Sequence, residues 1–89
     1  MASRFLKDPN AVLDYVVDWT TWLNGDTIAT ILWTVPAGIT QDSESESTTS
    51  ATVWLSGGTV GETYQLVNRI TTAGGRTEDR TIRITIVQR

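Results

Sequence analysis

The ionisable side chains that could carry out chemistry are ten carboxylates and a single lysine, Lys7, because the chain contains no histidine and no cysteine. The missing histidine removes the usual general base, the usual transition-metal ligand and the Ser–His or Cys–His nucleophile pairs. The missing cysteine removes thiolate catalysis, cysteine zinc sites and a disulfide-built extracellular immunoglobulin domain. Lys7 lies in an N-terminal segment that we expect to be flexible. We therefore expect that the protein is not an enzyme.

Three aspartates, Asp14, Asp18 and Asp26, were considered as a calcium site, since hard cations take several oxygen ligands. Asp14 and Asp18 stand four residues apart on an expected strand, a separation of roughly 13 Å at the usual rise, so they cannot share one ion. Asp26 belongs to a turn, where a carboxylate bonds its own backbone. The glycines within residues 72–76 have neither phosphate-loop spacing nor a following helix. We expect no metal and no other cofactor.

The four tryptophans divide into two groups. Trp19 and Trp33 fall on the expected inner faces of strands and should lie in the core. Trp54 falls on the outward side of its strand, and Trp22 also lies outside the core pattern. An outward tryptophan has three readings: cover by residues 1–10, a subunit interface, or a platform for stacking a sugar. The sequence leaves all three open.

The net charge of −3 hides an asymmetry. Residues 1–62 carry two basic side chains against eight carboxylates, or −6, whereas residues 63–89 carry five arginines against two carboxylates, or +3. These regions are either two oppositely charged surfaces of a monomer or surfaces through which one copy contacts another. The low isoelectric point, about 4.6, argues against nucleic-acid binding.

The arginines of the C-terminal region lie on or beside an expected hairpin, with Arg80 assigned to its outer face, opposite the isoleucines. Arginine blunts an exposed strand edge against aggregation and also suits ion-pair interfaces. The N-terminal segment adds an apolar tip. Together with the outward tryptophan these residues form our candidate protein interface: Phe5, Leu6, Trp54, Arg69, Arg76, Arg80 and Arg83.

The elements that must position these residues are strands. Period-two alternation and turn residues predict strands at 12–19, 27–35, 39–41 and 50–55, and a long hairpin over 61–87, without a convincing helical period. In the 27–35 strand we expect Ala29, Ile31, Trp33 and Val35 to point inward. The acidic stretch 42–50 predicts a solvated, mobile loop with at most a fraying edge strand.

The head of the final hairpin carries Gly61 followed three residues later by Tyr64, the spacing of a tyrosine corner in Greek-key sandwiches. We predict an all-β, Ig-like Greek-key β-sandwich of about seven short strands. Residues 1–10 should form an extended N-terminal arm, and residues 11–89 a single domain. No apolar run approaches 18 residues and the N-terminus lacks a signal-peptide core, so we expect neither a membrane span nor secretory export.

Several blocks of the sequence form a recognisable set: Lys7-Asp8-Pro9, Val12-Leu13-Asp14-Tyr15, Asp18-Trp19, Gly25-Asp26-Thr27-Ile28, Trp33-Thr34-Val35-Pro36-Ala37-Gly38, Val53-Trp54-Leu55-Ser56-Gly57-Gly58 and Asn68–Arg76. With these blocks the chain resembles a family of small Ig-like structural proteins of tailed bacteriophages and prophages, of the fibre–tail adaptor type. The resemblance covers nearly the whole chain. Its most specific parts are the Asp-Pro…Leu-Asp-Tyr block and the Trp-Leu-Ser-Gly-Gly block.

The resemblance implies a non-enzymatic virion component, made in the host bacterial cytoplasm, that docks on the tail or neck. Its partners would be other virion proteins, namely tail, neck or capsid subunits, with many copies in a symmetric assembly and no contact with nucleic acid or membrane. Two other functions stay open at this point. They are a capsid decoration protein and a glycan-binding Ig-like module for attachment to the host surface.

Overall fold

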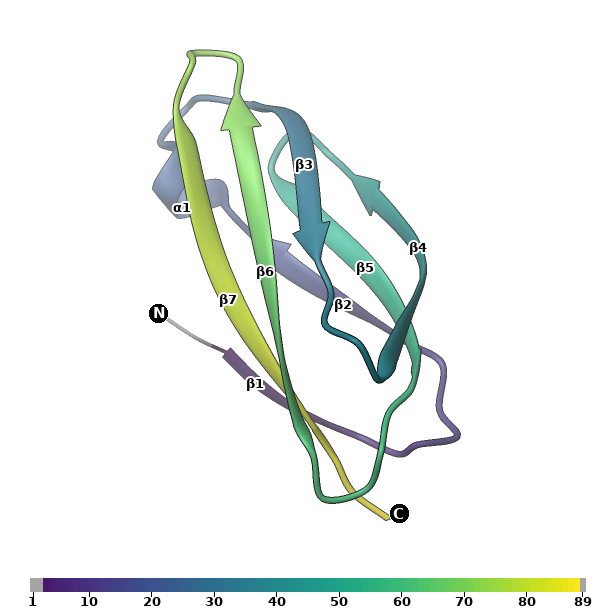
Figure 1. Cartoon of the computed structure of the whole chain (residues 1–89). Helices are drawn as coiled ribbons and strands as arrows, with labels where there is room; N and C mark the ends of the chain where they lie inside the picture. Colours follow the sequence, from purple (N-terminus) through teal and green to yellow (C-terminus); the bar gives the residue numbers. More distant parts are fainter. Residues whose placement is uncertain (1–2, 89) are drawn as a thin grey trace.

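The structure is a computed structural model that describes residues 3–88, and it is an all-β sandwich, as predicted (Figure 1). Two sheets pack face to face with the apolar side chains between them. The described part of the chain contains no helix long and apolar enough to cross a membrane. The elements are β1 (Ser3–Lys7), β2 (Leu13–Asp18), α1 (Thr20–Leu23), β3 (Ile28–Thr34), β4 (Ile39–Glu46), β5 (Ser50–Gly57), β6 (Thr63–Thr72) and β7 (Thr77–Ile86).

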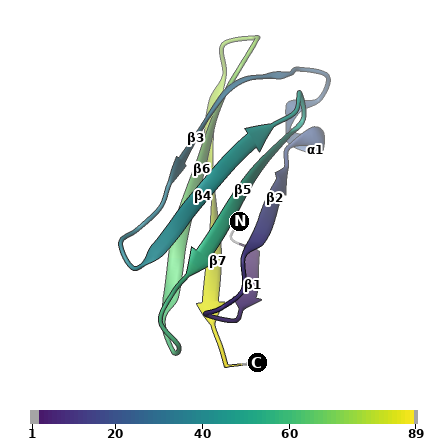
Figure 2. The same cartoon turned by 90° about the vertical axis from the view of Figure 1, so that its right-hand side faces the viewer.

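The larger sheet has the strand order β1-β7-β6-β3, and the smaller sheet has the order β2-β5-β4 (Figure 2). All pairs are antiparallel except β1 with β7, which run parallel. The long β6–β7 hairpin occupies the middle of the larger sheet, and Ile82, Ile84 and Ile86 point from it into the core. The period-two pattern of this hairpin is therefore confirmed.

The core contains one buried polar pair. Trp19 is fully buried, and its indole N–H donates a 2.9 Å hydrogen bond to the side-chain oxygen of Asn68, which is also fully buried. The Asn68 amide N–H₂ donates in turn to the carbonyl of Leu32 at 3.4 Å. This pair joins β6 to the segment that follows β2. The burial of Trp19 and Trp33 confirms both core predictions.

Tyr64 sits at the head of β6 in the arrangement that its spacing predicts. Its hydroxyl accepts a 3.1 Å hydrogen bond from the backbone N–H of Thr59, five residues upstream. The ring leaves no room at Gly38, where an added Cβ would lie 3.0 Å from the tyrosine and where φ is +101°. The tyrosine therefore fixes the β5–β6 connection and the turn before β4 against each other.

The prediction of which residues point inward from the 27–35 strand is wrong at one position. Ala29 is exposed and Ile28 is buried, whereas Trp33 points inward as predicted. The cause is a register shift between Ile28 and Thr30 in the pairing with β6. An extra residue at a bulge reverses the side-chain alternation, which strict period-two counting cannot detect. The single turn of helix, α1, was also not predicted.

The acidic stretch 42–50, expected to be a mobile loop, is mostly ordered strand. β4 extends to Glu46 and pairs with β5 along its length. A tight turn then returns the chain, in which the Ser47 hydroxyl accepts hydrogen bonds from the backbone N–H groups of Thr49 and Ser50. Composition misled the prediction, because charged side chains are compatible with an edge strand and discourage its pairing with another edge.

Residues 1–2 of the predicted arm lie outside the described residues, and the arm from Ser3 onward does not lie apart from the sheets. Its residues from Ser3 to Lys7 form β1 at the edge of the larger sheet. The backbone N–H of Val87 donates to the carbonyl of Lys7 at 2.9 Å, which continues the contact past the end of β7. Because β1 belongs to the larger sheet, it does not cover the Trp54 strand in the smaller one.

Candidate docking surfaces

The outer face of the smaller sheet, which we call the acidic face, presents Trp54 at its centre. Trp54 lies on the middle strand β5, and its neighbours Val53 and Leu55 point inward and are fully buried. The indole is 40% exposed, which confirms its predicted outward position. Across the sheet it has Asp14 on one side and Ser43 on the other. A large ring on a flat strand surface offers apolar area that a partner could cover.

The charge on the acidic face has one sign. Asp14 and Asp18 point outward from β2, and Asp42 lies at the β4 edge, where its carboxylate accepts a 3.1 Å hydrogen bond from Ser56. The sequence has no lysine or arginine from residue 8 to residue 68, so none of the three strands carries a cation. Val16 adds a second exposed apolar side chain next to Thr52. This face therefore combines a tryptophan with carboxylates, of which Asp18 lies near Arg80 and Asp42 lies near Lys7.

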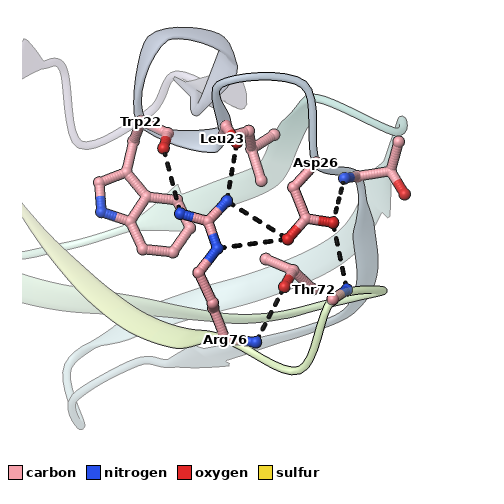
Figure 3. A network of polar contacts seen from close by, with 7 residues as sticks. Trp22, Leu23, Asp26, Thr72 and Arg76 are labelled. Atoms are coloured by element: carbon pink, nitrogen blue, oxygen red, sulfur yellow. Dashed lines mark hydrogen bonds and ion pairs between the residues drawn. The ribbon is translucent and has the colours of Figure 1, made fainter.

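Arg76, a candidate interface residue, is instead committed to an internal network (Figure 3). Its guanidinium donates to two carbonyl oxygens at the end of α1, those of Leu23 at 2.7 Å and Trp22 at 3.5 Å. It also pairs with Asp26 at 3.3 Å and lies 4.4 Å from the centre of the Trp22 ring. These contacts tie the β6–β7 turn to α1. Trp22 is accordingly half-buried and does not form an exposed platform.

Asp26 lies at the centre of the same network. One carboxylate oxygen accepts from the backbone N–H groups of Thr27 at 2.8 Å and Gly74 at 3.1 Å, and the other faces Arg76. Hydrogen bonding from the Thr72 side chain, then from these backbone groups and Arg76, lowers the pKa of Asp26 below its usual value. The bond to the Thr27 backbone confirms the predicted turn role.

We expect acid to weaken this network in the wild type and not in an Asp26→Asn variant. A lowered pKa in the folded state means that the stabilisation is complete above the ordinary aspartate pKa and is lost as pH falls through the lower value. Thermal unfolding between about pH 6 and about pH 2 should show a lower melting temperature for Asp26→Asn at the upper end and a shallower decline. Asp14→Asn, at an exposed aspartate, is the matched control. Equal declines for wild type and Asp26→Asn would contradict this role.

The outer-face position predicted for Arg80 is wrong. Arg80 has the same alternation as Ile82 and Ile84 and therefore lies on the inner side of β7, near its start. Its guanidinium stacks 4.2 Å from the centre of the Trp19 ring and donates to the carbonyl of Asp18 at 3.0 Å. Arg80 thus closes the end of the core over Trp19 and is not a free docking cation.

Arg69 and Arg83 do point outward, on the opposite face of the sandwich. Arg69 forms a two-contact ion pair with Asp79, directly across from it on β7, with the shorter contact at 2.7 Å. At side-chain exposures of 55% and 43% such a pair adds little to stability, because water and salt screen the two charges. Arg83 has no ion pair among residues 3–88, and the residue aligned with it on β1 is a further arginine, Arg4.

The two apolar residues of the predicted arm separate onto the two sides of β1. Phe5 is half-buried, with its ring 5.0 Å from that of Tyr15, and packs against the core. Leu6 points outward and is 53% exposed. Only Leu6 is therefore available to a partner, because alternate residues of a strand face opposite sides.

Lys7 is a residue whose role sequence reasoning missed. It is fully buried, and its ammonium group donates to the carbonyl oxygens of Gly57 at 2.8 Å and Asp8 at 2.9 Å. Burial lowers the pKa of Lys7, with nearby Asp8 and Asp42 acting against the shift. The sequence feature that pointed to this role is that Lys7 is the sole lysine in the chain. It lies where the chain passes from the larger sheet to the smaller one.

Within residues 3–88 we find no pocket, and no group of three or more acidic side chains is placed to hold a metal ion. The candidate sites that the fold presents are therefore surfaces. These surfaces define the class of protein: it is an all-β sandwich with an exposed tryptophan on one flat face and arginines on the other.

The comparison with protein families identifies the family of this chain. Residues 7–85 match the family described as Gp77, podophage GP4 fiber-tail adaptor protein gp77. The match covers most of the chain, and the chain belongs to this family. Fibre–tail adaptors have a structural role as components of the virion. No curated protein matches the chain.

Proposed function

We propose that the protein is a non-enzymatic Ig-like module that docks on the tail or neck of a bacteriophage particle and helps to attach a fibre. Its partners would be other virion proteins, and it would act in several copies after synthesis in the host cytoplasm. Membership of the adaptor family supports the structural role. The observation that carries the docking is the exposed tryptophan at the centre of the acidic face.

The position of Trp54 suits an interface for a physical reason. Its strand is held by β2 on one side and β4 on the other, so the indole is presented on a rigid, flat surface. Tryptophans in such positions are enriched among the residues that dominate binding energy, because they bury a large area with little loss of conformational freedom. Val16 and Asp14 beside it supply apolar area and charge for specificity.

Among the other candidate interface residues, the structure leaves Leu6, Arg69 and Arg83 outward-facing for docking. Phe5, Arg76 and Arg80 make internal contacts that the fold itself uses. Substitution of these three would lower stability as well as any docking, so they cannot test the proposal. Trp54 can, since its side chain lies outside the core.

The test is a Trp54→Ala variant in an assembling phage. We expect the free energy of unfolding of the isolated variant to lie within about 1 kcal/mol of the wild-type value, because the residue is substantially exposed. We also expect the variant to be lost from purified particles. Thr52→Ala, two residues away on the same face, is the matched control and should be incorporated normally. Normal incorporation of Trp54→Ala would overturn the docking role. Particles that contain the variant but adsorb poorly to cells would favour the glycan-binding reading.

A further inference from the structure

The outer face of the larger sheet, which we call the basic face, has the opposite charge to the acidic face. It carries Arg4, Arg69 and Arg83 against one outward carboxylate, Asp79, which is already paired. Leu6 on β1 and Leu32 on β3 add apolar side chains that are 53% and 55% exposed. Because the two sheets pack face to face, these two faces lie on opposite sides of the molecule (Figure 2).

The charged rows on the two faces have the same spacing. On the acidic face Asp14 and Asp18 are four residues apart along β2, with Val16 between them. On the basic face the row of Arg83 and the row of Arg69 are also four residues apart, because Gln65 is aligned with Arg83. Both separations are roughly 13 Å. On each face an uncharged row separates two rows with charged residues, and in the second such row of the basic face Arg69 is paired with Asp79.

The basic face also aligns two like charges on neighbouring strands. Arg4 and Arg83 are aligned across the β1–β7 pair, and like charges directly opposite each other destabilise a sheet. The nearest outward carboxylate on β7, that of Asp79, is four residues away and is held by Arg69. A carboxylate supplied from outside would remove this repulsion.

We propose that the acidic face of one copy docks on the basic face of the next, with Asp14 opposite the Arg4–Arg83 pair and Trp54 covered by the contact. The partner is a second copy of this chain, because the chain itself carries both complementary faces. Since the two faces differ, the contact is head-to-tail and can repeat from copy to copy. This inference rests on the proposed function, for which it names the neighbour that covers Trp54.

The broad side of the whole molecule sets an upper limit on such a contact. The Cα extents are 42 × 23 × 19 Å, so the rectangle that bounds this side measures about 970 Å². A specific interface of ordinary size covers about 800 Å² on each partner. The charged rows should also make the contact salt-dependent, since exposed charges are screened beyond about 10 Å at moderate salt.

The test measures the mass of the full chain in solution by sedimentation over a wide concentration range, at about 50 mM and about 500 mM salt. The wild type should associate progressively at low salt and less at high salt. The variants Asp14→Arg and Arg4→Glu/Arg83→Glu should each associate at least about tenfold more weakly, because like charges then meet. Glu78→Arg, at the hairpin tip and off both faces, changes the net charge as Asp14→Arg does and should behave as the wild type.

Mixing the two impaired variants distinguishes this geometry from other modes of association. Each retains one intact face, and the two reversed faces are again opposite in charge, so the mixture should regain the association that each variant alone has lost. A wild type that stays monomeric at low salt, or a mixture without rescue, would overturn the copy-to-copy contact. If Trp54→Ala were still lost from particles in that case, the proposed function would stand with a different neighbour. Normal incorporation of Trp54→Ala would instead reject the proposed function itself.

Discussion

Removal of residues 1–7 is expected to lower the free energy of unfolding by about 4 kcal/mol or more, a large part of the 5–15 kcal/mol that holds an ordinary domain. The deletion removes the whole of β1 and its hydrogen bonds to β7. It also removes the Phe5 ring from Tyr15 and the Lys7 ammonium from the Gly57 carbonyl. The buried isoleucines of β7 would then lie at a free sheet edge.

Denaturant unfolding of the shortened chain measures this effect, and Leu6→Ser is the matched control. Leu6 is on the same strand but faces outward, so its substitution should change stability by no more than about 0.5 kcal/mol. A deletion that leaves the stability near that of the wild type would contradict this role of β1.

Asn68→Ala is expected to cost about 2–4 kcal/mol, which lowers the melting temperature by about 10–20 °C in a domain of this size. The substitution leaves the buried indole N–H of Trp19 without its acceptor and opens a cavity between β6 and α1. An unsatisfied buried donor costs more than the hydrogen bond itself contributes, because water cannot reach it.

Gln65→Ala supplies the comparison for this prediction, by calorimetry under the same conditions. Gln65 lies three residues earlier on β6 with its side chain exposed, so its loss should change the melting temperature little. Equal shifts for the two variants would show that the Trp19–Asn68 pair contributes no more than a surface contact.

The sequence was sufficient to predict which residues of the final hairpin form the core. The alternation of Ile82, Ile84 and Ile86 predicts the inner face of β7, and the Gly61–Tyr64 spacing predicts the corner at the head of β6. Trp54 was predicted to point outward and does so. These features depend on period two and on short spacings, which local sequence records directly.

The positions of the arginine side chains could not be predicted from alternation and spacing. Arg76, Arg80 and Arg83 look alike in the sequence, yet Arg76 binds the end of α1, Arg80 covers Trp19 and Arg83 points outward. The positions of Arg76 and Arg80 depend on partners more than 50 residues away in the chain. Asn68 is similar, since only its place between two buried apolar positions hinted that its amide has a buried partner.

By itself the sequence determined the class of fold, the lack of histidine and cysteine chemistry, and the outward tryptophan, because composition and alternation are local properties of the chain. Only the tertiary structure decided that the N-terminal arm is a strand and that the acidic stretch is an edge. It also decided that opposite charges occupy opposite faces of the sandwich. The reason is physical: strand pairing and long-range hydrogen bonds depend on which segments meet in space, and one shifted residue at a bulge exchanges the two faces.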